Sequence, residues 1–120
     1  MFLQLGHTKL DVYQYSRSLT LECYKVTKHF PSDERFALTQ QIRRAALSVH
    51  LNLSEGASRK SALERKRFYE ISRGSIIEID SAIDIAVHLN YINKDQVDHL
   101  GEILIKTFKL LTGMIAHSES

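Results

Sequence analysis

The sequence has 120 residues, of which 43% are hydrophobic and 25% are charged, and its net charge is +2. A chain of this size and composition buries one core and is too apolar to be disordered, while one proline and five glycines are too few for the turns of an all-β protein. A single cysteine excludes an internal disulfide, and neither a signal peptide nor a transmembrane run is recognisable, so we expect one cytoplasmic domain with no membrane partner.

The first part of the chain predicts a helix over 9–30. Apolar and small residues from Val12 to Phe30 recur every three or four positions, which is the period of an amphipathic helix. The residue before Pro31 disfavours helical backbone, so the helix is expected to end there.

A second helix is expected over 33–56. Ser32 provides an N-cap, and two acidic residues follow it in the first turn, where negative charge favours the helix dipole. The apolar spacing continues from Leu38 to Leu53, and Gly56 has the chemistry of a left-handed C-terminal cap.

Two further helices, over 62–90 and 94–116, each begin at a capping box, in which the first residue and the fourth satisfy each other's free amides. These boxes consist of Ser61 with Glu64 and of Asn93 with Gln96. Four helices with short connections favour antiparallel neighbours, so the sequence predicts an all-α, up-down-up-down four-helix bundle spanning 1–120.

The second and third helices also carry apolar residues outside the face that is expected to form the core. These additional residues have two explanations. Either the core is wide, or a second face binds another copy of the chain. The residues concerned are Leu47, Leu51, Ile76, Ile83 and Val87.

Folding the second and third helices together about their connection is expected to bring small residues opposite each other. Gly74 and Ser75 would face Ala45, which allows a close crossing and gives a glycine within a helix a packing role. The same arrangement predicts an ion pair between the two helices, in which Glu78 pairs with Arg44 or, as the alternative, with Arg43.

Asn52 and Glu55 lie three residues apart near the end of the second helix. We expect them to bond to the neighbouring connection rather than to act in catalysis, because a paired-carboxylate enzyme needs a second free carboxylate and a pocket. The histidines form no metal-binding motif, no phosphate loop occurs, and Cys23 lies within an apolar stripe. We therefore expect no catalytic residue, no metal site and no cofactor.

The basic run RKSALERKR is the strongest chemical signal. Residues 43–73 hold eight Lys and Arg against three Asp and Glu, whereas residues 74–120 hold three against seven. Basic side chains at a helix start oppose its dipole, and binding an anion relieves that cost. The run contributes Arg59, Lys60, Arg65, Lys66 and Arg67, and Arg43 and Arg73 are candidates to extend it.

The joint pattern of these residues resembles the family of small four-helix-bundle proteins associated with intervening sequences in bacterial 23S ribosomal RNA. The residues that carry the resemblance are Phe30, Pro31, Glu34, Leu38, Gln41, Arg43, Arg44, Ala45, Ser48, Asn52, Glu55, Gly56, Gly74, Ser75 and Glu78. His50 stands where members often have a proline, so the second helix need not kink there. The resemblance implies a ring, typically a pentamer, and kinship with the nucleic-acid-binding accessory protein of diversity-generating retroelements.

Two functional hypotheses follow. In the first, a non-enzymatic homo-oligomer binds the backbone of RNA or DNA through its basic end, without sequence preference. In the second, the oligomer is a scaffold that binds a protein partner through exposed helical faces, and the basic residues only confer solubility.

Overall fold

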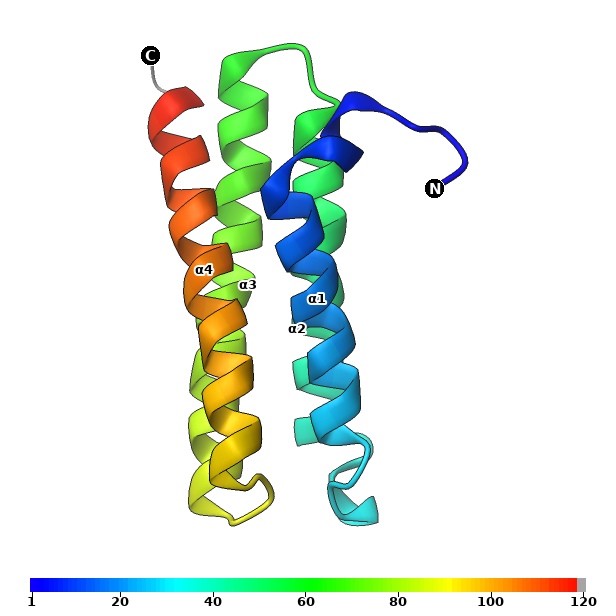
Figure 1. Cartoon of the computed structure of the whole chain (residues 1–120), viewed down its shortest axis with the longest axis vertical. Helices are drawn as coiled ribbons and strands as arrows, with labels where there is room; N and C mark the ends of the chain where they lie inside the picture. Colours follow the sequence, from blue (N-terminus) through cyan, green and yellow to red (C-terminus); the bar gives the residue numbers. More distant parts are fainter. Residues whose placement is uncertain (119–120) are drawn as a thin grey trace.

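The computed structural model of the chain describes residues 1–118, which form four antiparallel α-helices (Figure 1). Over these residues the chain contains no β-strand, so the all-α prediction is confirmed; residues 119–120 of the expected domain lie outside the described part. The helices are α1 (Asp11–Thr27), α2 (Leu38–Ala57), α3 (Ala62–His88) and α4 (Lys94–Ser118). Two 3-10 segments, η1 (Gly6–Lys9) and η2 (Ser32–Glu34), precede α1 and α2.

The four helices pack in a closed circuit. α1 contacts α2 and α4, and α3 also contacts α2 and α4, so each helix turns one side inward and leaves one side to solvent. The predicted stripes form the core, which confirms the helical periodicity. Its most deeply buried members include Leu19, Ile42, Leu53, Ile79, Leu100 and Leu111.

The second helix begins at Leu38, five positions later than the sequence predicts. Ser32 makes no side-chain cap; instead it opens η2, in which the amide of Glu34 bonds to the carbonyl of Pro31 at 2.9 Å and that of Arg35 to Ser32 at 3.1 Å. These tight i→i+3 bonds satisfy the amides that an N-cap would otherwise serve.

The ends of α3 and α4 are fixed by local hydrogen bonds. Asn93 and Gln96 form the complete predicted capping box, with bonds of 2.9 and 3.2 Å. Ser61 accepts a bond from the Glu64 amide at 3.0 Å, which is one half of the predicted box. At the end of α3, Asn90 adopts a left-handed φ of 63° and closes a Schellman motif.

The α1–α2 connection and the α3–α4 connection lie at the same end of the bundle and contact each other. Tyr91, between α3 and α4, donates its hydroxyl to Glu34 Oε2 at 2.9 Å, and its ring lies 5.3 Å from that of Phe30. This contact links the connection between α1 and α2 to the connection between α3 and α4.

The close approach of α2 and α3 occurs at Gly56, not at Gly74 as the sequence suggests. A Cβ on Gly56 would lie 2.8 Å from the Cβ of Phe68 and 2.9 Å from the ring of Tyr69. Gly56 lies inside α2 without a positive φ, so its predicted left-handed cap is wrong, and its role is to admit these side chains. A Cβ on Gly74 would meet nothing within 4 Å.

Serines bind α2 and α3 together along the rest of this contact. Ser72 donates to the carbonyl of Val49 at 2.7 Å, and Ser75 donates to the hydroxyl of Ser48 at 2.7 Å. Ser75 therefore holds the helix pair as predicted, but its partner lies about one turn further along α2 than Ala45.

The additional apolar residues of α2 and α3 follow both explanations, a wide core and an exposed second face. Ile76 and Ile83 are buried and widen the core, whereas Leu47 and Leu51 remain exposed on α2. An exposed apolar face is therefore present on α2, but two of the five residues that the sequence analysis named, Ile76 and Ile83, belong to the core instead.

Candidate nucleic-acid interface

The antiparallel order brings the end of α2 and the start of α3 to one end of the bundle, together with η1 and the end of α4 (Figure 1). We call this the basic end, defined by Arg59, Lys60, Arg65, Lys66 and Arg67. Lys9 of η1 lies exposed at the same end, and His117 of α4 lines a shallow pocket there with Arg65. The sequence analysis missed both, although the antiparallel topology that it predicted already places them there.

Arg65 holds the connection between α2 and α3. Its Nη1 donates to the carbonyl of Lys60 at 2.7 Å and to that of Arg59 at 3.1 Å, and the side chain is half-buried. The short connection leaves these carbonyls without helical partners, and the guanidinium one turn into α3 satisfies them. Arg65 is therefore a structural part of the basic end.

Arg59 is also held in place. It pairs with Glu55 one turn earlier, and its guanidinium lies 4.9 Å from the ring centre of Phe68. Glu55 thus serves the connection, as predicted. Asn52 instead donates to the carbonyl and the hydroxyl of Ser48 at 2.9 and 3.0 Å, so it bonds within its own helix and not to the connection.

Lys60 and Arg67 present their charges to solvent. Both are exposed, and neither forms an ion pair with another described residue. Lys66 is half-buried between them. Two exposed cations thus lie beside two arginines held by local contacts, an arrangement that suits contact with a flexible polyanion.

Arg43 does not extend this patch. It lies at the opposite end of the bundle, 16 residues and roughly 24 Å before Arg59 along the chain. There its Nε donates to Thr27 Oγ1 at 2.9 Å and its guanidinium stacks 4.8 Å from the ring centre of Tyr24. Its prediction as a binding residue is corrected: Arg43 joins α2 to the end of α1.

Arg73 lies further along α3, in the seam with α4. Its Nη1 donates to Thr112 Oγ1 at 3.4 Å, and its guanidinium is 5.9 Å from the ring centre of Phe108. Because Arg73 is only half-buried, it keeps donors for a ligand, but it stands apart from the connection that orders the other cations.

The predicted ion pair between Arg44 and Glu78 is wrong. Glu78 Oε2 accepts a hydrogen bond from Gln41 Nε2 at 3.1 Å. Arg44 is exposed and lines a shallow pocket with Tyr24 and Leu47, on the side of α2 that faces away from α3. The helical position of Arg44, one turn beyond Gln41 but rotated outward, accounts for the difference.

A polar pair in the core, which the sequence analysis missed, resembles a nucleophile with its base. Ser16 Oγ lies 2.6 Å from His50 Nδ1, and the ring of His50 packs 4.5 Å from that of Tyr13. Burial lowers the pKa of His50, and Arg17 and His7 lower it further. Ser16 is wholly buried, however, so no substrate reaches it, and the pair stabilises the contact between α1 and α2.

Residues 1–118 form neither a metal site nor a membrane span. No three His, Cys, Asp or Glu side chains come together there in a way that would hold a metal ion. Within the same residues no helix is both long and apolar enough to cross a membrane. Cys23 is buried, and burial raises the pKa of its thiol to about 12, with a further contribution from Glu22.

Comparison with known proteins identifies the fold and the family. A crystal structure of a protein of unknown function from the S23 ribosomal protein family of Bacteroides thetaiotaomicron superposes with a TM-score of 0.78 at 20% identity, covering 87% of this chain and 97% of that one. No curated protein matches the sequence. Residues 8–113 match the family described as 23S rRNA-intervening sequence protein. The chain therefore belongs to the 23S rRNA-intervening sequence protein family.

Proposed function

We propose that this protein is a non-enzymatic homo-oligomer that binds the phosphate backbone of RNA or DNA through its basic end. The observation that carries the proposal is the exposure of Lys60 and Arg67 beside two arginines fixed by the α2–α3 connection. Cations held by local contacts and exposed cations together neutralise phosphates without reading bases, so the binding has no sequence preference.

Self-association is supported by the outer face of α3. Leu63, Ile71, Ile77 and Ile85 are exposed along this helix at spacings that place them on one side. Gly74 lies within the same stripe with open space over it, so another helix can approach closely there. The family resemblance favours five copies in a ring, which would repeat the basic end and convert weak phosphate contacts into avidity.

Fluorescence anisotropy with a labelled mixed-sequence RNA, measured over a series of salt concentrations, tests the nucleic-acid half of the proposal. The double variant Lys60→Glu/Arg67→Glu should weaken binding, and should lower the slope of log affinity against log salt by about 1.4 for each engaged subunit. The matched control, Lys25→Glu/Lys28→Glu, makes the same change of charge at exposed positions of the opposite end. Equal losses in both variants would show that only net charge matters and would refute the basic end as the site.

A protein-binding scaffold is the second candidate function, and the exposed apolar face of α3 favours it. In this case the oligomer binds a protein partner through apolar contacts, and Lys60 and Arg67 only keep it soluble. Salt distinguishes the two functions, because an apolar contact keeps its affinity at salt concentrations that release nucleic acid. Light scattering at low and high salt, with and without RNA, measures both the oligomer and its gain in mass.

A further inference from the structure

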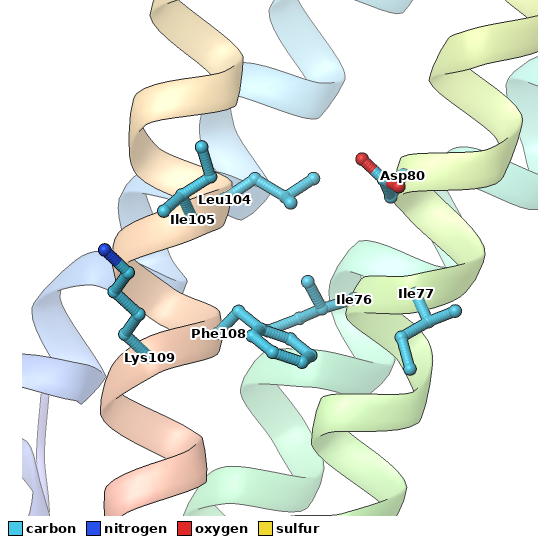
Figure 2. A pocket seen from close by; sticks show the side chains of 7 residues that line it. All are labelled: Ile76, Ile77, Asp80, Leu104, Ile105, Phe108 and Lys109. Atoms are coloured by element: carbon cyan, nitrogen blue, oxygen red, sulfur yellow. The ribbon is translucent and has the colours of Figure 1, made fainter.

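A groove between α3 and α4 is left unfilled by residues 1–118 (Figure 2). Its volume is about 270 Å³, below the range of about 300–1,000 Å³ typical of small-molecule pockets, so it suits one or two apolar side chains. Figure 2 shows Leu104 and Phe108 pointing from α4 toward α3. The apolar side chains that line the groove are Ile76, Ile77, Leu104, Ile105 and Phe108.

An apolar segment without a partner occurs elsewhere in the same chain. Residues 1–5, the N-terminal arm, extend away from the bundle (Figure 1). The side chains of Phe2 and Leu3 are 86% and 78% exposed. Gln4 has a φ of 48°, in the left-handed region that residues other than glycine rarely adopt, at the point where the arm leaves η1. Exposed apolar residues on a projecting arm are typical of a segment that binds another surface.

The arm does not reach the groove of its own chain. η1, where the arm begins, packs only on α1 and α2 within the described residues, whereas α3 and α4 form the groove on the other side. The bundle is 23 Å across in its narrowest dimension. The four residue-to-residue steps from Phe2 to Gly6 span at most about 14 Å even when fully extended. Within one copy the arm therefore cannot fill the groove, whereas the arm of another copy is free of this limit on reach.

We propose that the N-terminal arm of one copy binds in the α3–α4 groove of a second copy, with Phe2 packed against Phe108 and Leu3 against Ile105. Arm and groove are different surfaces, so the contact is heterologous: each copy gives an arm to one neighbour and receives one from another. Such contacts close into a ring when the rotation between copies allows it. The inference rests on the proposed self-association and names the segments that make it.

Engineered cysteines test the contact directly. The double variant Leu3→Cys/Ile105→Cys should form disulfide-linked dimers and larger species under mild oxidation, because the two positions would meet only between copies. Leu3→Cys/Leu21→Cys is the matched control, since Leu21 is 64% exposed and Ile105 is 54% exposed, but Leu21 lies on α1 and does not line the groove. Equal cross-linking in both variants, or none in either, would overturn the inference.

Light scattering of Phe2→Ser/Leu3→Ser separates this inference from the proposed function. The arm lies outside the core, so the variant should keep its helical circular dichroism while its mass falls below that of the parent protein. If the parent protein is an oligomer and the variant has the same mass, the arm contact is refuted. Self-association through the α3 face then stays in place. A parent protein that is monomeric at every concentration would refute both.

Discussion

The contact of Gly56 with α3 predicts a specific loss of stability on adding one methyl group. In Gly56→Ala the new Cβ would lie 2.8 Å from the Cβ of Phe68, an atom that cannot move without its backbone. Overpacking of this kind costs about 1–3 kcal/mol, and the helix propensity of alanine returns about 1 kcal/mol. Because the contact involves the base of a side chain, we expect the upper part of that range and a net loss of about 1–2 kcal/mol.

Urea unfolding, with each variant at the same protein concentration, measures the effect. The midpoint of Gly56→Ala should fall by roughly 0.5–1 M, given a typical slope of about 2 kcal/mol per molar. Gly101→Ala is the control: a Cβ there meets nothing within 4 Å, so the substitution should raise the free energy of unfolding by up to about 1 kcal/mol. If Gly56→Ala were as stable as the parent protein, the helices would have room at this point and the reasoning would be wrong.

Three further predictions concern other parts of the bundle. Because burial lowers the pKa of His50 below its ordinary 6.5, the unfolded chain takes up the proton first, and the free energy of unfolding should decrease as the pH falls below about 6.5. His50→Gln should remove that part of the pH dependence, up to about 1.4 kcal/mol per pH unit, in urea titrations between pH 7.5 and 5. With its thiol pKa raised to about 12 by burial, Cys23 should react with iodoacetamide at pH 8 only as fast as the protein unfolds; rapid labelling of the folded protein would contradict this. Arg65→Met should lower the free energy of unfolding by about 1–3 kcal/mol through the loss of its two bonds to the connection, while Arg67→Met should change it by less than about 0.5 kcal/mol and weaken RNA binding instead.

Helical periodicity predicts this fold well because it depends on one helix at a time. The spacing from Val12 to Phe30 identifies a buried stripe without any knowledge of its neighbours, and the box at Asn93 fixes a helix start through atoms only three residues apart. Such local signals gave the four helices and most of the core. Two boundaries differ: α1 ends at Thr27, three residues before the predicted end at Phe30, and α2 starts late at Leu38. The late start of α2 arises because tight turns compete with a side-chain cap for the same amides.

Contacts between helices were harder to predict because they depend on register. A shift of about one turn between α2 and α3 moves the partner of Ser75 from Ala45 to Ser48. Gly74 lies on the outer side of α3 and Arg44 on the outer side of α2, so the close approach of the two helices falls on Gly56 instead. Periodicity states which side of a helix is apolar, but it does not set how far two helices slide along each other.

The candidate site depends on both kinds of information. The run from Arg59 to Arg67 is contiguous, so the sequence located it correctly at one end of the bundle. The sequence did not show which cations of the run are structural and which are exposed. Arg65 lies on the side of α3 that faces the free carbonyls of the connection, whereas Arg67 lies on another side.

The bond between Tyr91 and Glu34 bears on how the molecule can open. The chain consists of two helical hairpins, α1 with α2 and α3 with α4, which are covalently joined only at the short connection held by Arg65. At the other end the two connections are joined by the bond between Tyr91 and Glu34 and by the ring contact with Phe30, and Gln41 bonds to Glu78 between α2 and α3. If the two hairpins separate, they therefore pivot at the connection in the basic end. The nucleic-acid contacts that we propose would lie at this pivot, and the bond between Tyr91 and Glu34 would lie at the end that moves most.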